Sequence, residues 1–296
     1  EHGQQDDWFN NKTIIILSTI TVFGLVLFIW RELTYKRPVV NLGVLKDGNL
    51  RIGTVMCFIL GFGLYGSTLI IPIYTQTILG WTATDAGLLL IPGSITTAFM
   101  MPIVGKLLQR GVPQSYMVGL GFLIFFFFTY MMHNNMTPST GVEHLYWGLI
   151  LRGIGLGLLF VPITTLSLST LKGKDIGEGA AFTGMMRQLG GSFGIATITT
   201  FITRFNQEHR VNLVSHLDTT RLEVQQRVLT LQKGFMSKGF TANESLNKAY
   251  QVIDYSVMKQ SAVLSYMDIF LYLGIMFLCC IPIIKKKKKG KNTINP

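Results

Sequence analysis

Seven long apolar stretches run through this chain, and they limit its possible folds more than any other feature. Their approximate bounds are 12–30, 52–75, 86–106, 115–132, 146–170, 179–203 and 262–284. A helix of about 20 apolar residues crosses the roughly 30 Å hydrocarbon core of a bilayer. Because backbone polar groups must be satisfied within each such segment, the sequence predicts an all-α integral membrane protein.

The composition and the placement of charge agree with that class. Of the 296 residues, 49% are hydrophobic and 14% are charged, whereas soluble domains have about 25% charged residues. The net charge is +11, and the five consecutive lysines Lys285–Lys289 directly follow the last apolar run. Such a cluster is typical of an anchor at an anionic membrane surface, so we favour lipid over nucleic acid as its partner.

Basic residues alternate between the connections and predict the orientation of the chain. Lys and Arg in short loops mark the cytoplasmic side of a membrane protein. The loops 76–85 and 133–145 contain neither residue type, so we expect them outside. The basic connections are 31–51, 105–114, 171–178 and the C-terminal tail. We therefore expect the N-terminus outside and the lysine tail in the cytoplasm.

The spans divide the chain into four parts. We expect an outer segment, a first membrane helix and a cytoplasmic connector in 1–50, five membrane helices in 51–203, an extracytoplasmic loop in 204–261, and the last helix with its tail in 262–296. Helical periodicity after Leu222 and a capping box at Thr241 predict two helices in the long loop. That loop is either a cap over the helix ends or a docking surface. The chain starts without Met or a signal peptide, so we expect it to be the C-terminal part of a longer polypeptide.

Two ionisable residues inside the spans are candidates for function. Arg152 lies about 9 Å, or six residues at 1.5 Å each, below the outer end of its span. Asp268 lies at a comparable depth in the last span. Ionisable residues inside a bilayer are costly and usually mark ion or substrate pathways. A direct Arg152–Asp268 pair is one hypothesis. The alternatives are a snorkelling structural arginine and an aspartate that faces water at the outer interface.

Other polar residues and clustered glycines lie within the same spans. Arg187 sits about two turns into its span and is either a cavity charge or a snorkelling side chain. Weaker candidates for lining a cavity are Tyr65, Gln76, Thr164 and Gln188. Glycines permit close approach between membrane helices. The candidates for such packing are Gly153, Gly155, Gly157, Gly190, Gly191 and Gly194.

The chain lacks the patterns that mark enzymes and metal proteins. Its three cysteines all lie inside apolar runs, and its five histidines are scattered. No phosphate-binding loop, dinucleotide-binding glycine pattern, zinc motif or nucleophilic triad is present. We therefore expect neither a cofactor nor a metal, and we disfavour a membrane-embedded enzyme.

Several motifs together resemble one transporter family. They are Asp7, Trp8 and Phe9 before the first span, Trp30-Arg-Glu-Leu33 after it, Gly80-Trp-Thr-Ala-Thr-Asp-Ala-Gly-Leu88 between spans, Arg152-Gly-Ile-Gly-Leu-Gly157, and Arg187-Gln-Leu-Gly-Gly-Ser-Phe-Gly194. The chain resembles the second half of the 14-span drug:proton antiporters of the major facilitator superfamily, the EmrB/QacA type. Gly105-Lys-Leu-Leu-Gln-Arg110 resembles the family's basic loop motif but lacks its Asp.

The resemblance implies a fold and a function. It implies one linker transmembrane helix followed by the C-terminal six-helix bundle, in a proton-driven exporter of hydrophobic drugs. Arg152 then corresponds to an arginine linked to proton transfer. It also implies a location in the bacterial cytoplasmic membrane, with a periplasmic adaptor and an outer-membrane channel as partners. Because alternating access rocks one bundle against another, we expect this part alone not to transport. The alternative is a truncated scaffold that docks partners through 204–261.

Overall fold

The computed structural model describes residues 11–34, 47–218 and 221–289, and within these ranges it leaves out the side chains of residues 25, 29, 33 and 282–289. Every element of regular structure in the described part is a helix. The helices are α1 (Lys12–Thr34), α2 (Gly48–Thr77), α3 (Ala83–Gln109), α4 (Gln114–Asn135), α5 (Val142–Leu168), α6 (Lys174–Ser215), α7 (Leu222–Met236) and α8 (Ala242–Lys289). Asp7, Trp8 and Phe9 and the connector after Thr34 lie outside the described residues, as do the side chains of Lys285–Lys289.

Local chemistry explains where the membrane helices begin. Asp47 caps α2, because its carboxylate accepts hydrogen bonds from the backbone N–H groups of Asn49 and Leu50. At α3, Thr82 and Asp85 form a reciprocal capping box. Such caps satisfy backbone donors that have no partner inside the helix, and each contributes about 1 kcal/mol. The turn before α3 passes through Gly80 at a φ of 73°, a conformation that favours glycine.

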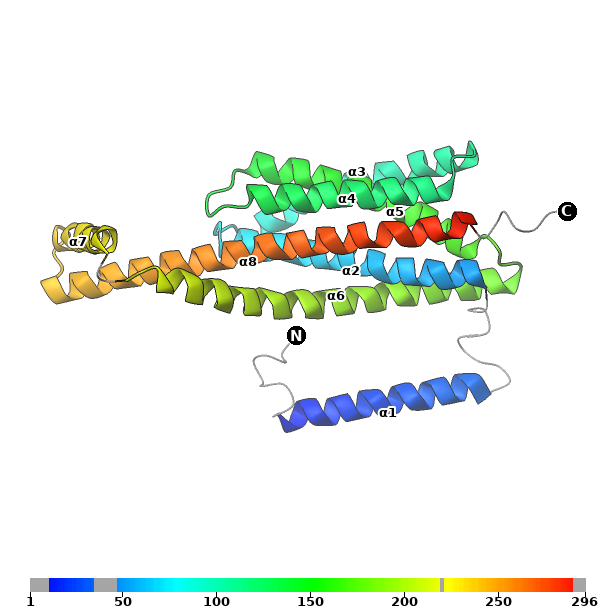
Figure 1. Ribbon diagram of the computed structural model, residues 1–296, viewed down its shortest axis with the longest axis horizontal. Coiled ribbons are helices and arrows are strands. Elements are labelled where there is room, and N and C mark those ends of the chain that lie inside the picture. The colour runs from blue at the N-terminus through cyan, green and yellow to red at the C-terminus, as the bar shows by residue number, and fades with distance from the viewer. Residues whose placement is uncertain (1–10, 35–46, 219–220, 290–296) are drawn as a thin grey trace.

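The helices α2 to α6 and α8 form one bundle, while α1 lies apart from it in Figure 1. The helix α2 packs against both α5 and α6, and α8 packs against α4 and α6. Most of the described side chains of α1, among them Phe23 and Trp30, are exposed, whereas Glu32 is buried. Apolar side chains that are exposed in this way are suited to contact with lipid.

Six described helices are long and apolar enough to cross a membrane: α1, α2, α3, α4, α5 and α8. The predicted span 179–203 falls in α6, which is not among them. The reason is composition, because this stretch contains Arg187, Gln188 and many Gly and Thr residues. The helix nevertheless runs beside α2 and α8 within the bundle. We therefore keep α6 as the seventh predicted span; its buried glycines pack on α2, while Leu189 and Phe193 are exposed.

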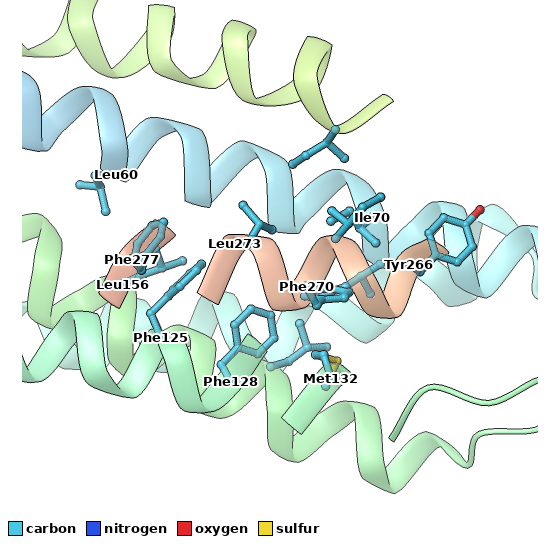
Figure 2. Packing of buried hydrophobic residues seen from close by; sticks show 14 of the residues in the cluster. Leu60, Ile70, Phe125, Phe128, Met132, Leu156, Tyr266, Phe270, Leu273 and Phe277 are labelled. Atoms are coloured by element: carbon cyan, nitrogen blue, oxygen red, sulfur yellow. The ribbon is translucent and has the colours of Figure 1, made fainter. Parts of the chain in front are cut away.

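Aromatic rings fill the core between α4 and α8 (Figure 2). Phe125 of α4 stacks on Phe277 of α8 with ring centroids 4.1 Å apart. Phe128 of α4 meets Phe270 of α8 edge-on at 5.7 Å. All four rings are fully buried. Offset and edge-to-face aromatic pairs contribute about 0.5–1.5 kcal/mol beyond the area that they bury.

The helices α2 and α6 approach each other too closely for ordinary side chains at the contact. A Cβ atom built on Gly190 would collide with the carbonyl oxygen of Phe58, and one built on Gly61 would collide with that of Arg187. Both obstacles are backbone atoms, so no side-chain rotation relieves the clash. The glycines therefore set how near α6 lies to α2.

The segment 204–261 differs from the two separate helices that the sequence predicts. Its first part is the end of α6, and α7 is the one separate helix that the described residues hold there. The capping box is present, because Thr241 and Glu244 exchange hydrogen bonds. It begins α8, which continues without a break into the last span. The expected second helix is therefore the outer end of the last span, since no helix-breaking residue separates the two.

We expect Gly190→Ala to destabilise the bundle, because the new methyl group would collide with the backbone at Phe58. Overpacking of this kind costs about 1–3 kcal/mol. Thermal unfolding of the detergent-solubilised protein measures the loss. Gly184→Ala is the matched control on the same helix, because a Cβ there has open space around it. Equal melting temperatures for the two variants would contradict the packing described here.

Candidate functional site

Arg152 is buried where α5 faces α2, with 5% of its surface exposed. Its Nε donates a hydrogen bond to Oγ of Ser67 at 2.9 Å. Its Nη2 donates to the carbonyl oxygen of Leu64 at 3.3 Å and to Oγ1 of Thr68. The guanidinium group is therefore held by three oxygens from a little over one turn of α2.

The two hydroxyl groups also form hydrogen bonds to backbone carbonyl groups of their own helix, and these bonds orient them. Ser67 Oγ donates to the carbonyl of Gly63 at 2.6 Å, and Thr68 Oγ1 donates to the carbonyl of Leu64 at 2.6 Å. Each hydroxyl proton is thus directed along α2, and a lone pair remains to accept from Arg152. The positive charge is stabilised by neutral dipoles, since no carboxylate forms a salt bridge with Arg152 in the described part of the chain.

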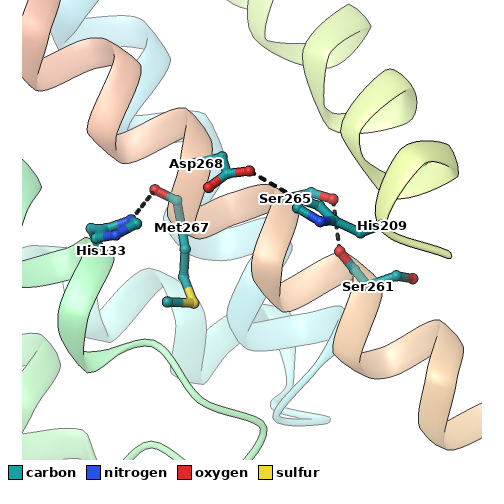
Figure 3. A network of polar contacts seen from close by, with 6 residues as sticks. All are labelled: His133, His209, Ser261, Ser265, Met267 and Asp268. Carbon is teal, nitrogen blue, oxygen red and sulfur yellow. Dashed lines mark hydrogen bonds and ion pairs between the residues drawn. The ribbon is translucent and has the colours of Figure 1, made fainter. Parts of the chain in front are cut away.

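Asp268 lies in α8 and has a different partner from the one that its depth suggests. Its Oδ2 is 2.7 Å from Nε2 of His209 in α6 (Figure 3). The hypothesis of a direct Arg152–Asp268 pair is therefore not met in this structure. Depth within a span says how far a residue lies from the interface. It says nothing of the direction in which the side chain points around the helix.

A short polar network surrounds this pair (Figure 3). Ser261 of α8 donates a hydrogen bond to Oδ1 of Asn206 in α6 at 3.0 Å. Ser265, one turn further along α8, donates to the carbonyl of Ser261. On the other side, Nδ1 of His133 in α4 lies 2.8 Å from the carbonyl oxygen of Met267. The network therefore links α4, α6 and α8.

Arg187 and its neighbour form a second polar group on α6. The guanidinium of Arg187 lies 4.5 Å from the ring centroid of Phe160 in α5, which is a cation–π contact. Gln188 accepts a hydrogen bond from the hydroxyl of Tyr65 in α2 at 2.9 Å. The structure thus brings Tyr65, Arg187 and Gln188 to the surface that α2, α5 and α6 share. Because Arg187 is only partly buried, its charge is accessible from this face.

The remaining candidates for lining a cavity are less well placed. Thr164 donates a hydrogen bond to the carbonyl of Phe160 in its own helix. Gln76 is exposed near the end of α2. Neither is brought into contact with Arg152 or Asp268 by a hydrogen bond that the structure records. Within the described residues, no three His, Cys, Asp or Glu side chains lie close enough to hold a metal ion.

The six candidate glycines lie at close helix contacts. A Cβ atom at Gly153 or Gly157 would collide with α3, and one at Gly155 would press on the α4 backbone at Phe125. The α6 glycines meet α2 in the same way, with obstacles at Phe58, Tyr65 and Phe62 for Gly190, Gly191 and Gly194 respectively.

The sequence does not single out His209, Ser67 or Thr68. His209 lies in the segment 204–261 that the sequence predicts to be a loop, because the apolar run ends near residue 203, whereas the structure places it in α6. The available signal was spacing: Phe201, Phe205 and His209 recur every four residues, so one face of the helix continues past that point. The adjacent hydroxyl residues of α2 carried no comparable signal, since Ser and Thr commonly bond back to their own helix.

Comparisons with known proteins agree with this architecture. Residues 8–195 match the family model described as Major Facilitator Superfamily. The Fatty acid resistance protein FarB of Neisseria gonorrhoeae is 28% identical over 96% of this chain and 54% of its own length. The Multidrug export protein EmrB of Haemophilus influenzae is 29% identical over 74% of the chain and 42% of its own length.

A third relative is the Lincomycin resistance protein LmrB of Bacillus subtilis, which is 31% identical over 66% of the chain and 40% of its own length. The chain therefore spans about half the length of the curated relatives that it matches.

We expect Arg152→Ala to loosen the contact between α2 and α5. Hydrogen bonds to a charged group contribute about 1.5–3 kcal/mol each, so the loss should exceed that of an ordinary surface substitution. The protein's melting temperature in detergent should fall clearly. Arg110→Ala provides the control, because Arg110 is exposed at the end of α3. If the two variants had the same melting temperature, the buried contacts of Arg152 would contribute nothing to the stability of the protein.

Proposed function

Because the chain belongs to the Major Facilitator Superfamily, we propose that it forms the C-terminal part of a proton-coupled multidrug efflux antiporter that works by alternating access. Its relatives include proteins named for multidrug export, which supports a role in the transport of small molecules. The observation that carries the proposal is the polar face of α2, α5 and α6, which contains a partly buried arginine.

That face is unsuited to lipid. Arg187 and Gln188 lie inside the predicted span 179–203 of α6, and Gln188 is hydrogen-bonded to Tyr65 of α2. Ionisable groups at such positions almost always face a bundle interior or a water-filled cavity. In a protein about twice this length, a second bundle opposite this face would enclose the cavity, and substrate would bind between the two.

The chemistry of the chain suits varied hydrophobic substrates. The chain contains 20 Phe and 13 Met residues, and flexible Met-rich surfaces are common where one site accepts many ligands. The relatives are named for resistance to fatty acids, for multidrug export and for resistance to lincomycin. We assign to this chain hydrophobic, drug-like small molecules as substrates.

We assign different roles to the three charged candidates. Arg152 is enclosed, and hydroxyl and carbonyl oxygens accept its hydrogen bonds, which suits a fixed charge that holds α2 against α5. Arg187 is partly exposed and stacked on Phe160, which suits a charge at the cavity wall. Asp268 is partly exposed and in contact with a histidine, which suits proton coupling.

The protein would lie in the bacterial cytoplasmic membrane with its lysine tail inside, and a periplasmic adaptor and outer-membrane channel would act with it.

A second candidate function has one observation in its favour. The outer ends of α6 and α8 project past the bundle together with α7 in Figure 1, and Leu222 and Leu229 of α7 are exposed there. A scaffold that docks partners through 204–261 would use this surface.

Dye efflux from cells that express the complete reading frame separates the two functions. Export that stops when the proton gradient is collapsed supports the antiporter, and absent export supports the scaffold.

We expect residues 1–296 alone to give no proton-driven dye transport in liposomes, because one bundle has no counterpart with which to close the cavity. The measurement is dye movement after an imposed pH gradient. Liposomes that contain the protein from the complete reading frame serve as the control. Gradient-driven exchange by residues 1–296 alone would refute the requirement for a second bundle.

A further inference from the structure

We infer that His209 and Asp268 form a proton-uptake site, in which His209 carries the proton and Asp268 positions it. This inference rests on the proposed proton-coupled function and adds to it a residue outside the predicted spans. The two side chains meet at 2.7 Å between α6 and α8 (Figure 3). Their side chains are 24% and 35% exposed, so water reaches both while the neighbouring helices enclose the rest.

The contact defines which ring nitrogen takes the proton. In the neutral imidazole, Nε2 must carry its hydrogen to donate a hydrogen bond to the Asp268 carboxylate. The incoming proton therefore binds Nδ1, and a neutral ring beside a carboxylate becomes an imidazolium–carboxylate ion pair. No other bond forms or breaks, and release returns the same proton to water. Histidine is the side chain that changes charge most readily between about pH 5 and 8.

Several ionisable groups on the neighbouring helices have partners or positions of their own. On α6 and α8, Arg210 and Asp254 form a separate ion pair at 2.9 Å, and that pair is more exposed. From α4, His133 approaches the backbone carbonyl of Met267 and not the carboxylate. From α2, Arg51 is the single charged residue, and it lies in the first turn, at the opposite end from the outer loop 76–85.

The pair lies in a contact region between the two long helices α6 and α8. Phe205 of α6 stacks on Tyr272 of α8 with ring centroids 5.4 Å apart, and Asn206 bonds Ser261 at 3.0 Å. When His209 binds a proton, an ionic attraction is added between α6 and α8. When it releases the proton, a hydrogen bond from the neutral imidazole to the carboxylate remains. A ligand shifts a conformational equilibrium only through its different affinity for the two states. Here the proton favours the state in which α6 and α8 are joined at this point.

The test is the rate of gradient-driven dye export by the protein from the complete reading frame, reconstituted in liposomes and measured against the pH on the outer side. We expect the unmodified protein to change rate by up to about tenfold per pH unit on one limb of its profile, as a single titrating group does. His209→Arg keeps the positive charge but cannot lose it, so its rate should vary less than about twofold over the same range. Asp268→Asn should also flatten the profile, and Asp268→Glu should restore it.

The matched control is Asp254→Asn, which removes the other ion pair between α6 and α8 without removing a histidine. Its pH profile should keep the shape of the unmodified protein. An unchanged profile in His209→Arg would overturn the inference while leaving the antiporter intact. Equal flattening by Asp254→Asn would also overturn it, because the pair would then act only as a structural clasp. If export by the unmodified protein ignored the proton gradient, the proposed function itself would fail, and the inference with it.

Discussion

The cost of enclosing a guanidinium group among apolar helices is the constraint on which the rest of this bundle depends. An isolated charge in such surroundings is strongly unfavourable unless hydrogen bonds satisfy it. Arg152 meets that requirement with Ser67, Thr68 and the carbonyl of Leu64, all on one stretch of α2. The rotation and height of α5 relative to α2 are therefore limited to those that keep these oxygens within reach.

A second constraint acts where α2 meets α6. There α6 approaches so closely that Gly61 and Gly190 leave no space for a side chain. Polar contacts with α5 and backbone contacts with α6 therefore both fix the position of α2 in the bundle. The same helix contributes Tyr65 to the partly exposed polar face, where its hydroxyl group donates a hydrogen bond to Gln188 of α6.

Much of this architecture was predictable from particular residues, and some of it was not. The apolar runs located most of the helices, and Thr241 and Glu244 correctly predicted a helix start. Hydropathy cannot show that α6 and α8 continue past the apolar runs, because a polar helix outside the membrane has no apolar requirement. The partner of Asp268 was also beyond prediction. Pairing depends on how two helices are rotated about their axes, and a single sequence records only depth.

Because α8 is one continuous helix, a movement at one point along it is transmitted to its end. Asp268 and the start of the helix at Ala242 are 26 residues apart, which is about 39 Å of rigid rod. A small change in the tilt of α8 at Asp268 would displace the start of the helix, where α7 is attached, by a much larger distance. A protein or a neighbouring copy of this chain that binds at that end would therefore act on the His209–Asp268 contact through the length of α8.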